Sequence, residues 1–236
     1  MDVKKVFQDP RYRLVFALVI GALVGAVGRL LRHHTSPEPA PFNWLVEMER
    51  RGFPPPMMVA VGLWIIPGVY WEFAARNATK VKEPFRTRSV HLFLTSAAQL
   101  LVLVPIPGLR ERFLPLAAPI WIAGLVIEVL AVALTVWSRA VLGKNWSGAI
   151  ATNVDHELIR RGPYRHVRHP IYTGIIGTYL GITLVSGELH ALIGLALVLV
   201  AYARKIRMEE AHLHEAFGPA YADYAQNSWR LIPRIY

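Results

Sequence analysis

Long apolar runs alternate with short polar segments along the chain. Two shorter apolar runs, 171–186 and 191–203, are separated by only four residues, a spacing that predicts a helical hairpin. Four longer runs can each cross the roughly 30 Å hydrocarbon core of a bilayer as an α-helix. They occupy residues 14–31, 57–75, 90–108 and 114–137. Because backbone groups cannot stay unpaired in lipid, the pattern predicts an all-α fold, a polytopic membrane helical bundle of about five to six spans.

A further amphipathic stretch follows the hairpin, from Tyr202 to Phe217. Its apolar residues recur at helical spacing, and Gly218 suits a helix end. We therefore expect a cytoplasmic C-terminal helix here. The sequence has no internal repeat, low-complexity tract or linker, which predicts one continuous membrane domain. Residues 1–137 would supply its N-terminal membrane spans, and residues 138–236 would carry the candidate site.

The basic residues are divided unevenly between the two sides of the predicted bundle. If the N-terminus is cytoplasmic and each of the four long runs crosses once, 20 of the 26 lysines and arginines fall on the cytoplasmic side. Cytoplasmic loops of membrane proteins carry an excess of Lys and Arg, so this division predicts the orientation. The N-terminus, the loop 138–169 and the C-terminus are expected to be cytoplasmic.

Composition excludes several classes of function. Hydrophobic residues make up 54% of the chain, and the formal net charge is +10. Because the basic residues lie between apolar runs, they indicate topology and membrane lipid as a partner, with no nucleic acid. The chain has no cysteine, and its histidines lack the spacing of metal ligands. Neither a metal site nor a cysteine nucleophile is expected.

The densest group of polar side chains lies in residues 155–174. Pro170 suits the first position of a helix, which would put His169 beside a helix N-terminus. Free N–H groups at such an end bind anions such as a carboxylate. Tyr164 and Tyr172 offer rings for a purine or a sulfonium. A basic loop is also what membrane topology alone produces here, so both interpretations stay open.

Two adjacent acids form the second candidate group. Glu209 and Glu210 flank the apolar stripe of the predicted C-terminal helix instead of lying opposite it. Acids on a surface that faces a bundle or a membrane are costly and usually have a partner or a task. The alternative to a role in chemistry is a structural ion pair with Arg207 or with the basic loop. Glu128, inside the fourth long run, is expected to pair with a basic group at a helix end.

Several short motifs follow one another in the last two-fifths of the chain. They are His156-x-Leu158-Ile159, Gly162-x-Tyr164, Arg168-His169-Pro170-x-Tyr172-x-Gly174, Glu209-Glu210, Phe217-Gly218-x-x-Tyr221-x-x-Tyr224 and Ile232-Pro233. In order and spacing, this series resembles the isoprenylcysteine carboxyl methyltransferase family and its phospholipid N-methyltransferase relatives.

The resemblance implies a membrane methyltransferase that uses S-adenosylmethionine and forms S-adenosylhomocysteine. Residues 138–236 would be its cofactor-binding catalytic core, reached by a lipophilic substrate from the bilayer. The implied cofactor contacts are His156, Glu157, Leu158, Ile159, Tyr164, His169, Pro170, Ile171, Tyr172 and Glu209. The implied catalytic residues are Glu209, Glu210 and His169, and the implied substrate-binding residues are Lys205, Arg204 and Arg207.

Lys205 is a departure from the family pattern. Eukaryotic isoprenylcysteine enzymes have an arginine tied to substrate at this position, and lysine cannot make the same bidentate contact with a carboxylate. The acceptor therefore stays open among a carboxylate, a phospholipid amine and a small hydrophobic thiol or hydroxyl. A carboxylate needs no general base. An ammonium group does, and Glu209, Glu210 or a nearby histidine would serve.

Two other functions remain compatible with the sequence. An NADPH-dependent membrane reductase of the sterol type has a similar C-terminal helical layout, and a non-enzymatic membrane protein, such as a transporter, would bind no nucleotide-like ligand. The Arg168-His169-Pro170-x-Tyr172 motif together with the acidic pair favours methyl transfer. That hypothesis requires Tyr172 and Glu209 to lie against each other.

Overall fold

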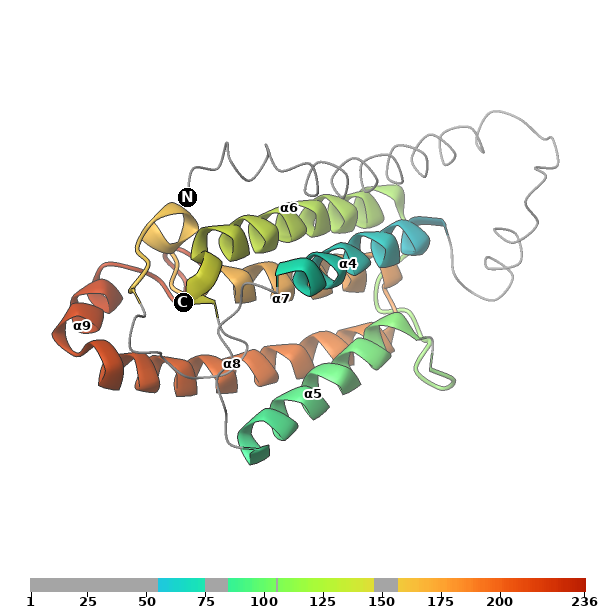
Figure 1. Cartoon of the computed structure of the whole chain (residues 1–236). Coiled ribbons are helices and arrows are strands. Elements are labelled where there is room, and N and C mark those ends of the chain that lie inside the picture. The colour runs from blue at the N-terminus through green and yellow to red at the C-terminus, as the bar shows by residue number, and fades with distance from the viewer. Residues whose placement is uncertain (1–54, 75–84, 105, 147–156) are drawn as a thin grey trace.

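The computed structural model describes residues 55–74, 85–104, 106–146 and 157–236. These residues contain six α-helices and two short 3₁₀ helices, η2 (Gly143–Asn145) and η3 (Gly162–Arg165), and no strand beyond two isolated bridges. The α-helices are α4 (Pro55–Ala74), α5 (Phe85–Leu103), α6 (Ala118–Leu142), α7 (Pro170–Ser186), α8 (Leu189–Phe217) and α9 (Pro219–Gln226) (Figure 1). The all-α prediction is confirmed for this part of the chain. The predicted span 14–31 and His156 lie outside the described residues.

Prolines shift the ends of two predicted spans. Helix α5 ends at Leu103 instead of residue 108, and α6 begins at Ala118 instead of residue 114. The connection contains Pro107 and Pro115, and proline disfavours a helical conformation at the residue before it. Pro119 then lies in the first turn of α6, where a missing N–H costs nothing.

The predicted hairpin is confirmed, but the predicted C-terminal helix is not a separate element. Gly187 ends α7 in the left-handed conformation (φ 63°), and α8 begins at Leu189. Helix α8 then continues without a break to Phe217, because the charged residues after position 203 are good helix formers. Gly218 (φ 52°) ends the helix, as predicted, and the short α9 follows.

Helix α7 is the central helix of the bundle. It packs most extensively against α6 and also contacts α4, α5 and α8, while α5 lies mainly against α8 (Figure 1). The core between these helices includes Val102 of α5, Ile182 and Val185 of α7, and Val198 of α8. The predicted division after residue 137 falls within α6, so the two parts share a helix and the division stays a prediction.

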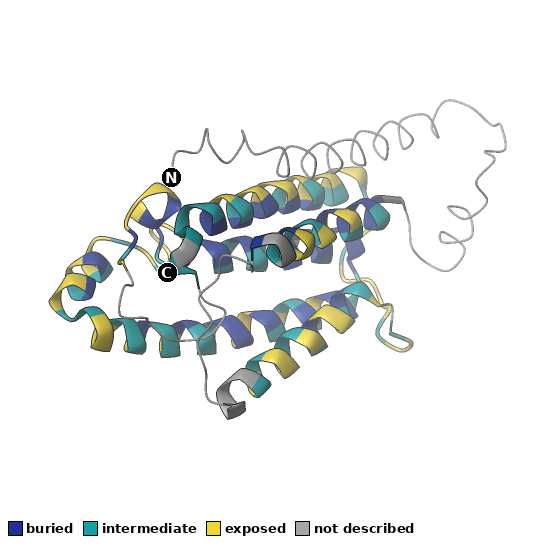
Figure 2. Ribbon diagram, in the orientation of Figure 1, coloured by how far each residue is buried: buried dark blue, intermediate teal, exposed yellow. Residues whose placement is uncertain are grey.

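The outer faces of the bundle are apolar. Large apolar side chains of α5, α6 and α8 are exposed, among them Phe93 of α5 at 72%. Exposed positions follow one side of these helices (Figure 2). Such a surface is typical of helices that face lipid. Among the described residues, α6 and α8 are each long and apolar enough to span a membrane, and α4, α5 and α7 have shorter apolar stretches. The described part is a helical bundle with two candidate membrane spans, and the total number of spans stays a prediction.

Glycines allow α6 and α7 to approach closely. A Cβ atom at Gly181 would lie 2.7 Å from the Cβ atom of Glu128. A Cβ atom at Gly174 would lie 2.7 Å from the carbonyl oxygen of Ala131 and would overlap the Thr135 hydroxyl. Small residues permit this kind of packing between membrane helices. The contact fixes the position of α7, whose first turn carries predicted site residues.

Glu128 is fully buried at this contact. Neither of its carboxylate oxygens has a hydrogen-bond partner among the described residues. The pairing with a basic group that the sequence led us to expect is therefore not found in that part of the chain.

Replacing Gly174 with alanine should destabilise the protein, because the new methyl group has no room between α7 and α6. Overpacking a well-packed contact costs about 1–3 kcal/mol. Thermal unfolding in detergent measures the effect. Gly68→Ala on α4 is the matched control, since nothing lies within 4 Å of its Cβ position. Equal melting temperatures for the two variants would contradict the close contact.

Candidate active site

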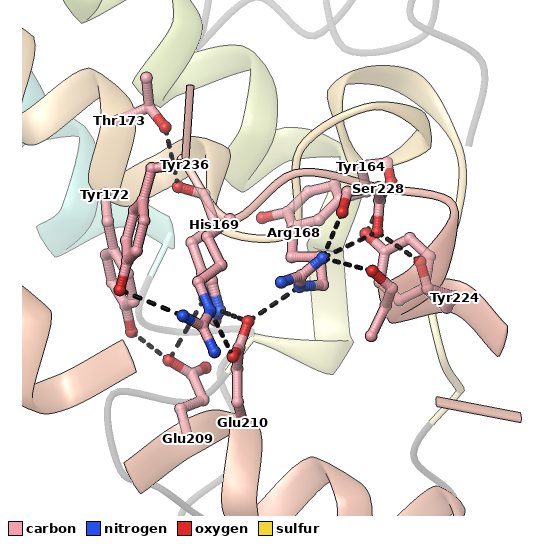
Figure 3. Close-up of polar contacts among 12 residues, drawn as sticks. Tyr164, Arg168, His169, Tyr172, Thr173, Glu209, Glu210, Tyr224, Ser228 and Tyr236 are labelled. Carbon is pink, nitrogen blue, oxygen red and sulfur yellow. Dashed lines mark hydrogen bonds and ion pairs between the residues drawn. The ribbon is translucent and has the colours of Figure 1, made fainter. Parts of the chain in front are cut away.

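The predicted site residues meet at the end of the bundle where α7 begins. His169 is the N-cap residue of α7, and Pro170 occupies the first helical position, as predicted. Helix α8 extends past its apolar stretch and carries Glu209 and Glu210 to the same place (Figure 3). The packing of α6 on α7 and the unbroken α8 therefore position two groups that lie far apart in the sequence.

His169, Tyr172 and Glu209 form the centre of the site. The Tyr172 hydroxyl donates a hydrogen bond of 2.7 Å to the Glu209 carboxylate, which confirms that these two residues lie against each other. The rings of His169 and Tyr172 stack, with an interplanar angle of 5° and centroids 5.5 Å apart. The Nδ1 atom of His169 lies 3.8 Å from the Glu209 carboxylate. The ammonium of Lys205 lies 5.6 Å from the centroid of the Tyr172 ring.

Glu210 is held between two arginines, an arrangement that we call the arginine clamp. The Nε atoms of Arg168 and Arg230 each donate a hydrogen bond of 2.8 Å, one to each oxygen of the Glu210 carboxylate. The Arg168 side chain is only 9% exposed. The hydrogen bond to Glu210 raises the pKa of Arg230 above its ordinary value. For Glu210, the structure thus contains the ion pair with the basic loop that the sequence left as an alternative.

The imidazole of His169 lies between the two acids. Its Nε2 atom is 3.4 Å from a Glu210 oxygen, but the geometry is not that of a hydrogen bond, and this buried atom has no hydrogen-bond partner among the described residues. The backbone N–H of His169 donates to the carbonyl of Arg230 at 3.0 Å. The ring is therefore held in place through its backbone and through stacking on Tyr172.

The C-terminal strap, residues 228–236, crosses the start of α7. Backbone N–H groups of Arg168 and Trp229 donate to the carbonyls of Trp229 and His166 at 2.7 and 2.9 Å, respectively. The Thr173 hydroxyl donates to the carbonyl of Leu231 at 2.8 Å. Arg168 also donates to the carbonyl of Ser228 (Figure 3). The strap thus joins the loop before α7, the first turn of α7 and, through Arg230, helix α8.

Buried tyrosines support the site from the side of η3 and α9. The Tyr224 hydroxyl donates to the carbonyl of Tyr164 at 2.6 Å. Burial raises the pKa of Tyr164 and of Tyr221 well above the ordinary value, and it raises the pKa of Tyr224 to about 12. All three phenols therefore stay protonated at neutral pH, and the buried Tyr221 hydroxyl has no hydrogen-bond partner among the described residues.

The other predicted site residues lie around this centre at different depths. Ile159, Tyr164, Pro170 and Ile171 are buried, Leu158, Arg204 and Lys205 are half-buried, and Glu157 and Arg207 are exposed. The backbone N–H of Glu157 donates to the Asn145 side chain at 3.4 Å. None of the described hydrogen bonds or ion pairs joins residues 157–159 to Glu209 or Glu210. Their part in a site stays a prediction.

The sequence did not assign Arg230, Thr173 or Tyr202 to the site, and Tyr202 was predicted only as the start of the amphipathic helix. Tyr202 packs against Tyr172 with ring centroids 4.8 Å apart. Arg230 and Thr173 belong to the strap contacts, for which the only sequence signal was the Ile232-Pro233 motif. Within the described ranges, no group of three or more His, Cys, Asp or Glu side chains could hold a metal ion.

Glu210→Ala should lower the melting temperature strongly, because it leaves the buried Arg168 and its neighbour Arg230 without a counter-charge. Breaking a buried pair by removing one partner costs about 3–5 kcal/mol. Asp223→Ala is the matched control, since its ion pair with Arg160 is solvent-exposed and worth about 0–1 kcal/mol. Similar small losses for both variants would show that the clamp does not hold the fold together.

The chain is similar to known proteins in sequence. Residues 123–215 match the model of the isoprenylcysteine carboxyl methyltransferase (ICMT) family. Protein-S-isoprenylcysteine O-methyltransferase of Schizosaccharomyces pombe is 34% identical over 96 residues, 39% of this chain and 41% of that protein. Nickel-cobalt-cadmium resistance protein NccN of Alcaligenes xylosoxydans xylosoxydans is 33% identical over 120 residues, 49% and 53% of the two chains. Protein-S-isoprenylcysteine O-methyltransferase A of Arabidopsis thaliana is 24% identical over 149 residues, 61% and 72%.

The fold is also similar to a solved structure. The structure of the eukaryotic intramembrane Ras methyltransferase ICMT has a TM-score of 0.53 and 18% identity, over 77% of this chain and 66% of that chain. At this identity, the likeness is one of fold alone. The chain spans about half the length of the first two relatives, 41% and 53%. The matched segment 123–215 contains His169, Tyr172 and the two acids, and it ends before the C-terminal strap.

Proposed function

We propose that the chain is an integral-membrane methyltransferase of the isoprenylcysteine carboxyl methyltransferase family, whose model residues 123–215 match. It transfers a methyl group from S-adenosylmethionine to a lipophilic acceptor. The observation that carries the proposal is the contact between Tyr172 and Glu209, with His169 stacked on the same tyrosine. It joins the two motifs that favour methyl transfer over the reductase and non-enzymatic alternatives.

The residues at the start of α7 suit the charged end of the cofactor. The first N–H groups of an α-helix lack intrahelical partners and attract a carboxylate, so Ile171 and Tyr172 would hold that group. The Glu209 side chain is 31% exposed and offers its charge to an ammonium or a sulfonium. The Tyr172 ring has a π face, which attracts cations, and the Lys205 ammonium already lies 5.6 Å from its centroid.

The protein's own task is to position the reactants. When bound, S-adenosylmethionine would supply a methyl group carried on a positive sulfur, and S-adenosylhomocysteine would be left as the product. Since this methyl group is already activated, proximity and orientation supply most of the rate enhancement. The arginine clamp fixes Glu210, and α8 thereby fixes the adjacent Glu209 against Tyr172.

The two acids have different roles in this proposal. Both oxygens of Glu210 accept hydrogen bonds from arginines, so we assign Glu210 a positioning role. Glu209 is bound by Tyr172 at one oxygen and remains available for an acceptor that must lose a proton, with His169 beside it. An acceptor that is already a carboxylate anion needs no such base.

The acceptor is proposed as the carboxylate of an isoprenylcysteine or a related lipophilic compound, with a phospholipid amine as the second candidate. The family match supports the first. The ammonium of Lys205 beside the Tyr172 ring supports the second, because lysine lacks the fork with which arginine binds a carboxylate. Arg204 and Lys205 are half-buried next to the site and would contact the acceptor's polar group.

The site is proposed to face the cytoplasm, together with both termini. The uneven division of basic residues supports this orientation. The acceptor's apolar part would then lie among the helices in lipid, while its polar group reaches the first turn of α7.

Isothermal titration calorimetry with S-adenosylhomocysteine tests the cofactor assignment. The wild-type chain in detergent should bind the ligand, and His169→Ala and Glu209→Ala should abolish binding while the proteins still purify as single species. His166→Ala and Glu215→Ala are matched controls, because both side chains are exposed in neighbouring positions on the same segments. They should bind like wild type. Binding that survives both site substitutions would refute the residue assignment.

Mass spectrometry after incubation with an isotope-labelled methyl donor tests the acceptor. A prenylated cysteine should gain a base-labile methyl ester if the acceptor is a carboxylate, whereas a phospholipid extract should gain methyl groups on nitrogen if it is an amine. Lys205→Arg should raise ester formation severalfold, because arginine restores the bidentate contact. An unlabelled outcome with both acceptors, despite bound S-adenosylhomocysteine, would remove both candidates.

A further inference from the structure

The C-terminal strap carries an apolar surface that the described part of the protein does not cover. Ile235 is 76% exposed, and Trp229, Ile232 and Tyr236 are also exposed. This segment is at the same time bound to the body of the protein through Trp229 and Leu231. It is therefore an ordered segment with its apolar side chains turned outward.

Four backbone N–H groups at the end of the strap form hydrogen bonds within the strap. The N–H groups of Leu231 and Ile232 donate to the carbonyl of Tyr236 at 2.8 and 3.1 Å, and those of Ile235 and Tyr236 donate to the carbonyl of Ile232 at 3.1 Å each. Arg234 permits this tight turn by adopting a positive φ of 67°. Pairing these four N–H groups internally lowers the cost of moving the segment into a medium of low polarity.

The strap also lies beside a helix that enters the membrane. Its residues bond to the N-cap residue and the first turn of α7, through His169 and Thr173. Helix α7 contains no charged residue. The strap is therefore placed where the chain passes from the polar face of the protein into the apolar layer.

The chemistry of the strap is that of an interfacial segment. Residues 228–236 contain Trp229 and Tyr236, the two residue types enriched at membrane–water interfaces. They contain no acidic residue; Arg230 is paired with Glu210, while Arg234 and the nearby Arg161 and Arg165 are exposed. This charge complements the anionic phosphates of phospholipids.

From these observations we propose that the C-terminal strap docks into the headgroup layer of the bilayer. Ile232, Ile235 and the ring of Trp229 enter the boundary of the acyl chains, and Arg234 binds a lipid phosphate. The proposal concerns a lipid contact of the strap and does not depend on the acceptor or on methyl transfer.

Single-cysteine labelling tests the docking, because the natural sequence has no cysteine. Ile235→Cys carries an environment-sensitive fluorophore, and Glu215→Cys, exposed on the polar end of α8, is the matched control. Each full-length variant is reconstituted at one copy per nanodisc, in phosphatidylcholine alone or mixed with phosphatidylglycerol. Iodide in solution and a nitroxide on the lipid acyl chain then serve as opposing quenchers.

The label at 235 should resist iodide severalfold better than the label at 215, and the lipid nitroxide should quench it. Added phosphatidylglycerol should strengthen the protection, and a second substitution, Arg234→Gln, should weaken that lipid dependence. Unchanged thermal unfolding of the labelled variants shows that they are folded. Equal iodide quenching at 235 and 215 would overturn the proposal. Protection that appears only with two copies per disc would also overturn it, because a second chain would then cover the strap.

Discussion

The ion pairs of Glu210 are the interaction on which the site depends. Three segments contribute one side chain each: Arg168 from the loop before α7, Glu210 from α8 and Arg230 from the strap. Because the carboxylate is buried, both arginines are needed to offset its desolvation. Glu209 and His169 are the immediate neighbours of Glu210 and Arg168 in the chain, so this buried pairing sets the distance between them. Ion pairs thus hold together the polar end of a chain that has no cysteine and therefore no disulfide bonds.

Different interactions hold the helices together within the bundle and at the start of α7. Between α6 and α7, glycines at 174 and 181 allow close backbone packing, and the surface that faces outward is apolar. Such contacts suit lipid, where no hydrophobic effect drives one helix onto another. At the start of α7, hydrogen bonds, ion pairs and buried tyrosine side chains hold the segments together. Tyr172 belongs to both regions, since its ring packs on Tyr202 while its hydroxyl reaches Glu209.

The sequence predicted the parts of this arrangement that rest on periodicity or on a contiguous motif. The apolar runs gave the hairpin and the start of α7, and the order of motifs brought Tyr172 to Glu209. The ends of α5 and α6 differed because prolines override an apolar run. The continuation of α8 was missed because a change from apolar to charged residues marks the edge of the membrane and not the end of a helix. The ion pair of Arg230 with Glu210 was missed because a tail without a periodic pattern gives no sign of its partner. The basic partner expected for Glu128 is not found in the described ranges.

The unbroken α8 has a consequence for the membranes in which the protein can work. The same helix is long and apolar enough to span a membrane and carries Glu209 beyond its apolar stretch. A rigid helix transmits any adjustment of that stretch directly to Glu209. Tilting or local thinning of the bilayer, the usual responses to hydrophobic mismatch, would therefore move the acidic pair relative to the lipid surface. Bilayer thickness would then change the depth in the membrane at which a lipid-attached group reaches the site.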